Sequence, residues 1–125
     1  MLGKSKAFST FSVTDIEKAK AFYANTLGIK VKEGMMGILE LHINGSTPVM
    51  VYPKPNHQPA VFTVLNFPVP DIEKTVADLK EKGISFEIYK HEDFKTDSDN
   101  IMRSGDHKIA WFKDPFGNIL SVVKE

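Results

Sequence analysis

Apolar residues recur with two different periods in the first half of the chain, and each period predicts one kind of element. An alternation of apolar and polar residues predicts a strand, whereas apolar residues three to four positions apart predict a helix. Residues 15–27 have the helical spacing, and Gly28 follows them as a stop signal. The segments that predict strands are residues 7–13, 29–32, 38–43 and 48–52. The first half therefore predicts the order β-α-β-β-β.

The second half of the chain repeats this order with one interruption. Residues 71–82 have the helical spacing and are followed by Gly83. Residues 91–108 have no apolar periodicity, which predicts a loop long enough to reach over a cavity. The predicted strands are residues 60–67, 85–90, 109–113 and 118–123. Three prolines between residues 53 and 59 indicate the connector between the two halves.

One eight-residue sequence motif occurs twice and supports the division into two units. The motif FSVTDIEK at residues 11–18 returns as FPVPDIEK at residues 67–74, with six of eight positions identical. The two copies are 56 residues apart, which is close to half of the chain, and this spacing indicates two copies of one supersecondary unit. The helix of the first copy can be capped by Thr14 or by Asp15, but Pro70 leaves only Asp71 in the second copy. We therefore predict an aspartate cap in both.

Composition and charge exclude several classes of function. Of the 125 residues, 16 are Lys or Arg and 16 are Asp or Glu, so no overall field favours nucleic acid or an anionic membrane as a partner. The absence of cysteine excludes disulfides, thiolate metal sites and cysteine nucleophiles, and it fits a reducing compartment. The first residues lack the apolar core of a signal peptide, and no apolar stretch has the length of a membrane span. We expect a cytoplasmic protein.

The ordered set of short motifs resembles the vicinal oxygen chelate superfamily, which includes glyoxalase I, extradiol dioxygenases, fosfomycin-resistance enzymes and bleomycin-resistance proteins. The motifs are VTD at 13–15, AFY at 21–23, LG at 27–28, VPD at 69–71 and FKDPFGN at 112–118. The resemblance implies an α+β fold in which two β-α-β-β-β units form a half-closed eight-stranded cup, with the helices outside and the ligand inside. It also implies one domain over residues 1–125, with unit one at about 1–56 and unit two at about 57–125.

The resemblance further implies a divalent metal held by residues of four cup strands, and this chain departs from that pattern. The implied positions are Phe8, Met50, Val64 (or Leu65 after a shift by one) and Ser121. Hard divalent ions need imidazole nitrogens or several oxygen donors that converge, and these side chains do not supply them. We therefore expect no family metal and no other cofactor.

Strand parity indicates which residues line the cup instead. Pairing across the last hairpin places Trp111 opposite Ser121, so that both share a face, although a slip of one residue would turn Phe112 inward instead. Similar reasoning at the Asn44-Gly45 hairpin places Glu40 beside Met50. The residues that we expect to bind a ligand are Phe8, Thr10, Glu40, His42, Met50, Tyr52, Asn66, Trp111 and Ser121.

Three functions remain open from the sequence. The preferred hypothesis is a glyoxalase/bleomycin-resistance-like protein that binds a small organic molecule in an apolar and aromatic cup, without the family metal and with no assigned catalytic residue. The alternative is a lyase, isomerase or dioxygenase that uses a relocated metal or a metal-free acid–base pair, with Glu40 and His42 as the candidates. The third is a cup plugged by its own side chains that acts through protein contacts. A twofold homodimer is the expected assembly, with a monomer as the alternative.

Overall fold

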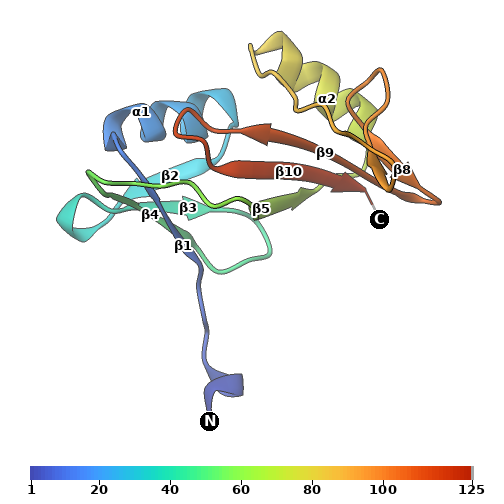
Figure 1. The fold of residues 1–125 in the computed structure, drawn as a ribbon. Coiled ribbons are helices and arrows are strands. Elements are labelled where there is room, and N and C mark those ends of the chain that lie inside the picture. The colour runs from blue at the N-terminus through green and yellow to red at the C-terminus, as the bar shows by residue number, and fades with distance from the viewer. Residues whose placement is uncertain (125) are drawn as a thin grey trace. The chain divides into compact units, whose positions relative to one another are not determined.

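The computed structural model describes residues 1–124, and the contacts within it divide the chain into two compact units (Figure 1). Unit 1 is Met1–Gln58 and unit 2 is Pro59–Glu125. The α+β class with two four-stranded sheets is confirmed, and the β-α-β-β-β order holds for unit 1 and for the main sheet of unit 2, where β8 takes the place of the predicted strand 85–90. That the two units form one domain stays a prediction.

Unit 1 is a four-stranded sheet with one helix packed on it. The strand order is β1-β4-β3-β2, in which β1 and β4 are parallel and the other neighbours are antiparallel. Its elements are η1 (Leu2–Lys4), β1 (Thr10–Val13), α1 (Ile16–Ala21), the π-helical turn η2 (Phe22–Thr26), β2 (Lys30–Glu33), η3 (Met35–Gly37), β3 (Leu39–His42) and β4 (Val49–Pro53). The predicted elements are present, with their ends shifted by a few residues.

The helix begins where the sequence predicts and covers one face of the sheet. The Asp15 carboxylate accepts hydrogen bonds from the backbone N–H groups of Glu17 and Lys18, both at 3.1 Å, so the aspartate cap is confirmed. Buried and partly exposed residues alternate along β3 and β4. The buried set forms a core with Ala19 and Tyr23 of the helical segment, and it comprises Phe11, Val13, Leu39, Leu41, Val49 and Val51.

Unit 2 repeats the same sheet topology. The strand order is β5-β10-β9-β8, again with the first pair parallel and the others antiparallel. The helix is capped by Asp71, whose side chain accepts from the backbone N–H of Lys74 at 3.1 Å. The elements are β5 (Thr63–Pro68), α2 (Ile72–Glu81), β6 (Lys90–His91), β7 (Phe94–Lys95), β8 (Met102–Ser104), β9 (His107–Lys113) and β10 (Ile119–Lys124).

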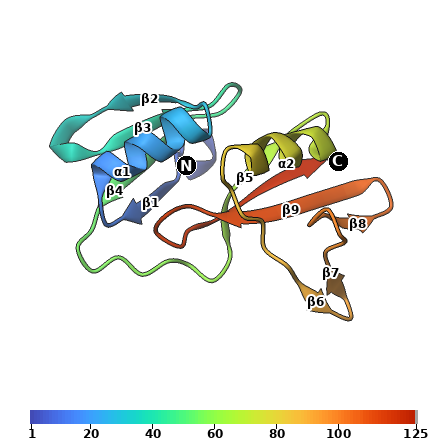
Figure 2. The same cartoon turned by 90° about the horizontal axis from the view of Figure 1, so that it is seen from above.

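Two predictions in unit 2 are wrong. Residues 85–90 were expected to form a strand. Instead Phe86 makes an isolated backbone bridge to Phe112, and Lys90 belongs to the small β6–β7 hairpin. Residues 91–108 were expected to form a loop, but they contain β7 and β8 and the start of β9. Figure 2 shows the β6–β7 hairpin at the edge of unit 2, close to β8. The sequence of β8 lacks the alternation of apolar and polar residues that predicts a strand. It is extended because it pairs with β9.

The repeated register places equivalent side chains in both units. In unit 1 Met50 lies between Thr10 and Glu40, and in unit 2 Ser121 lies between Asn66 and Trp111. The predicted pairing of Trp111 with Ser121 and of Glu40 with Met50 is therefore confirmed. Since cross-strand partners share a face, each row lies on the sheet face opposite its sequence neighbours, which are Leu39 and Val51 in unit 1 and Phe112 and Leu120 in unit 2.

No helix of residues 1–124 combines the length and the apolar character that crossing a lipid bilayer requires.

Candidate functional site

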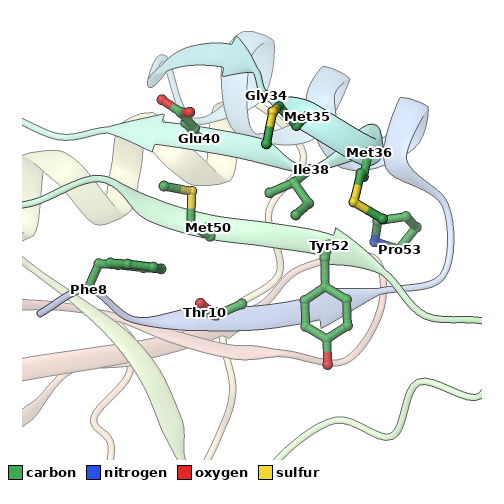
Figure 3. Close-up of a pocket in the computed structure, with 10 residues that line it drawn as sticks. All are labelled: Phe8, Thr10, Gly34, Met35, Met36, Ile38, Glu40, Met50, Tyr52 and Pro53. Atoms are coloured by element: carbon green, nitrogen blue, oxygen red, sulfur yellow. The ribbon is translucent and has the colours of Figure 1, made fainter.

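A pocket of about 520 Å³ lies on the face of the unit 1 sheet that α1 does not cover. Figure 3 shows Phe8 and Glu40 at one end of this pocket, Tyr52 and Pro53 at the other, and Met50 between them. The lining residues are Phe8, Thr10, Gly34, Met35, Met36, Ile38, Glu40, Met50, Tyr52 and Pro53. We call this cavity the unit 1 pocket.

Strand alternation explains why these side chains meet. On β3, Leu39 and Leu41 are buried toward the helix, so Glu40 between them turns to the other face. The same parity on β1 and β4 turns Thr10 and Met50 to that face. Phe8 lies just before β1, and 58% of its side chain is exposed. The pocket therefore keeps an apolar surface open to an approaching molecule.

Two methionines at the mouth of the pocket come from the turn η3. Met35 and Met36 are 83% and 90% exposed, and both line the cavity. Met36 has φ 59° and ψ 32°, which is the left-handed region that a residue other than glycine rarely adopts. Gly37 follows with φ 74°. This turn holds two flexible, polarizable side chains out of the core and beside the cavity.

One carboxylate lines the pocket, and a histidine orients it. His42 Nε2 lies 3.0 Å from Glu40 Oε1, and both side chains are about one third exposed. Since a carboxylate only accepts, the imidazole donates to it. The other carboxylate oxygen, Oε2, lies toward Gly34, where an added Cβ would approach it to 3.3 Å. His42 thus fixes one oxygen of Glu40 and leaves the second oxygen beside the backbone of Gly34.

Trp111 belongs to an aromatic cluster in unit 2. Its ring centroid lies 5.2 Å from that of Tyr89 and 4.8 Å from that of Phe94, and its indole N–H donates to Thr63 Oγ1 at 3.1 Å. The side chain is only 6% exposed. These residues border a cavity of about 360 Å³, which Val61, Phe62 and Ile119 also line.

The other two predicted residues of unit 2 bond to each other. Ser121 is fully buried, and its hydroxyl donates to the side-chain carbonyl of Asn66 at 2.5 Å. This hydrogen bond joins β10 to its parallel neighbour β5. The pair therefore satisfies the buried hydroxyl of Ser121.

The predicted residues thus fall into groups. Five of the nine line the unit 1 pocket, and His42 contacts that pocket through Glu40. The three in unit 2 are Asn66, Trp111 and Ser121. That all nine bind one ligand stays a prediction.

Sequence reasoning missed part of the pocket wall. It did not identify the turn residues Met35 and Met36, or Ile38, as lining residues. The signal was present as GMMG at residues 34–37, two apolar residues between glycines in a connection that joins two strands. Strand parity says nothing about such a turn, because it applies only to extended backbone.

The positions implied for the family metal do not fit a hard divalent ion. Phe8 and Met50 in unit 1 offer a ring and a soft thioether, while Val64 and Ser121 in unit 2 offer a methyl surface and a hydroxyl already bonded to Asn66. Within residues 1–124, no three His, Asp or Glu side chains come together as a metal-binding group. Glu40 and His42 form a pair without a third such partner.

Comparison with known proteins assigns the family. The model of the Glyoxalase/Bleomycin resistance protein/Dioxygenase superfamily matches residues 8–122, so the chain belongs to this superfamily. This finding agrees with the resemblance to the vicinal oxygen chelate proteins. No curated protein matches the chain.

Solved structures similar to the chain come from several bacteria. A member of the same superfamily from Sphaerobacter thermophilus is 24% identical with a TM-score of 0.75, and the match covers 100% of each chain. A glyoxalase family protein from Enterococcus faecalis is 24% identical with a TM-score of 0.70, covering 98% of this chain and 99% of the other. A glyoxalase/bleomycin resistance protein from Streptomyces is 25% identical with a TM-score of 0.66, covering 94% and 98%. These likenesses extend over both units and show the glyoxalase-type fold.

Proposed function

We propose that this chain binds a small organic molecule in the unit 1 pocket. The observation that carries the proposal is the cavity of about 520 Å³, whose size falls in the range of roughly 300–1,000 Å³ typical of small-molecule sites. Its wall is mostly aromatic and thioether surface, with Thr10, Glu40 and the Tyr52 hydroxyl as polar groups. Such a wall holds a ligand by packing and orients it by a few hydrogen bonds.

The ligand binds without the family metal in this proposal. The replacement of the implied metal positions by residues such as Phe8 and Met50 supports it. The proposed setting is the cytoplasm, which the absence of cysteine supports, and the proposed assembly is a twofold homodimer with no nucleic-acid or membrane partner.

Native mass spectrometry of protein purified from cells tests the binding proposal. We expect a bound organic molecule on the wild-type protein. The Thr10→Trp variant fills the pocket and should lose it, because Thr10 lies on the sheet face that lines the cavity. The Asn25→Trp variant is the matched control, since Asn25 is an exposed residue of η2 on the helical side of unit 1. Equal ligand content in all three proteins would contradict a ligand in this pocket.

The second candidate function is a metal-free lyase or isomerase, and the contact between His42 and Glu40 at 3.0 Å favours it. A carboxylate with a histidine on one oxygen can accept a proton from a bound substrate through the other. The Glu40→Gln variant separates the two functions. Loss of turnover with intact binding would support the enzyme, whereas no turnover of any bound molecule by the wild-type protein supports binding alone.

A further inference from the structure

We propose that the ligand of the unit 1 pocket carries a protonated amino group that binds Glu40 Oε2. This inference rests on the proposed binding function and names the chemical class of the ligand. Glu40 is the one acidic or basic residue among the ten that line the pocket. The occupant is therefore an apolar organic molecule with an ammonium group at one end.

The two oxygens of the Glu40 carboxylate have different surroundings. Oε1 accepts from His42, whereas no hydrogen bond within residues 1–124 reaches Oε2. A Cβ at position 34 would lie 3.3 Å from Oε2, so the lack of a side chain at Gly34 leaves room beside this oxygen. A ligand N–H can approach this oxygen without displacing a protein donor.

The two lysines closest to Glu40 do not pair with it. Lys32 lies opposite Glu40 on β2, and Lys30 lies opposite His42. Both lysines are exposed, and in the described part of the chain neither forms an ion pair with the carboxylate. A bound ligand that covers the one-third-exposed carboxylate excludes water from it, so the ligand's cation then interacts with the anion more strongly than it would in water.

The rest of the wall suits the apolar body of such a molecule. Phe8 and Tyr52 offer ring surfaces, and Met35, Met36 and Met50 offer thioethers that adapt to different shapes. Aromatic faces also attract cations, so these rings favour an ammonium compound over a carboxylate. The wall and the carboxylate thus select the same class of ligand.

Three probes of one shape test this inference by isothermal titration calorimetry: naphthylmethylamine, naphthylmethanol and naphthoate. We expect the wild-type protein to bind the amine about tenfold tighter than the alcohol, as a hydrogen bond to a charged group allows. Naphthoate should bind weakest. In Glu40→Gln the preference for the amine should disappear, while the affinity for the alcohol changes by less than about twofold.

The outcomes distinguish this inference from the function on which it rests. If the alcohol binds as tightly as the amine, and Thr10→Trp abolishes both while Asn25→Trp does not, the pocket binds ligands but the amine preference is overturned. If none of the three probes binds the wild-type protein, the binding function and the inference both fail. His42 is a positioning residue here, so His42→Ala should lower the ratio of amine to alcohol affinity part of the way toward that of Glu40→Gln. An unchanged ratio contradicts that role.

Discussion

Ser12 Oγ and His57 Nδ1 lie 2.6 Å apart, although the two residues are 45 positions apart in the sequence. Ser12 belongs to β1, and His57 lies in the proline-containing connector that follows β4. The hydrogen bond therefore fixes the later part of the connector to the first strand of unit 1. The connector is thus part of unit 1 as far as Gln58.

The His57→Ala variant should destabilise the protein. Removing this part-buried hydrogen bond should lower the free energy of unfolding by about 1 kcal/mol, measured by urea denaturation. His91→Ala is the control, since His91 is exposed in the β6–β7 hairpin. An equal loss in both variants would contradict a specific role of the Ser12–His57 contact.

Acid should weaken the ion-pair cluster around Glu73. Lys108 and Arg103 donate to Glu73 Oε2 at 2.9 and 3.0 Å, and these contacts lower the pKa of Glu73 from 4.5 to about 2. Because the pKa in the folded protein is the lower one, the stabilisation is present above about pH 4.5 and is lost as the pH falls toward 2. Urea midpoints measured across this range should fall less in Glu73→Gln than in the wild-type protein. Parallel declines would show that the cluster contributes nothing.

Replacing Met36 should separate backbone strain from ligand contact. Its left-handed φ of 59° costs a residue with a side chain roughly 1 kcal/mol, so Met36→Gly should leave the free energy of unfolding unchanged or raise it by about that amount. Ligand affinity should fall, because the thioether at the pocket is lost. In Met35→Gly, where the backbone is not left-handed, we expect a loss of stability instead. A loss of stability in both variants would argue against strain at Met36.

The fluorescence of Trp111 should report on the aromatic cluster of unit 2. The indole is 6% exposed, so emission should be blue-shifted in the wild-type protein. Phe94→Ser removes a ring whose centroid lies 4.8 Å away and should shift emission to the red. Phe62 lines the same cavity, but the rings in contact with Trp111 are those of Tyr89 and Phe94. The spectrum of Phe62→Ser should therefore stay close to that of the wild type. Identical spectra for all three would contradict this arrangement.

Elemental analysis should find well below one equivalent of Ni, Zn, Fe, Mn or Co in untagged protein. The physical reason is that Phe8, Val64 and Ser121 lack the donors such ions need. Unchanged ligand binding after treatment with a chelator would agree with this expectation. A stoichiometric metal whose removal abolishes binding would overturn it.

The sequence could predict most of the fold because its signals are local. The aspartate caps follow from side-chain chemistry at Asp15 and Asp71, and the pairing of Trp111 with Ser121 follows from the turn between their strands. β8 was not predicted because its three residues gain their order from pairing with β9, which is a tertiary effect. The prediction of a loop at residues 91–108 was wrong for the same reason.

The candidate site could be predicted only where it lies on strands. Parity identified Thr10, Glu40 and Met50, since successive side chains of a strand point to opposite faces. It could not identify Met35 and Met36, because their direction depends on the dihedral angles of one turn. It named Glu40 and His42 as a candidate pair, but it could not establish their hydrogen bond, since that contact depends on rotamers.

The two sheets have the same register, so positions in one unit can be compared directly with positions in the other. Glu40 and Trp111 hold the same place in their units, each opposite the residue in the middle of its row, and so do Met50 and Ser121. The two places differ in burial, because Glu40 is about one third exposed whereas Trp111 is 6% exposed among the rings of Tyr89 and Phe94, so a carboxylate at position 111 would be buried without a partner. Ligand preference is therefore best altered at position 40 in unit 1, while unit 2 keeps its own sequence.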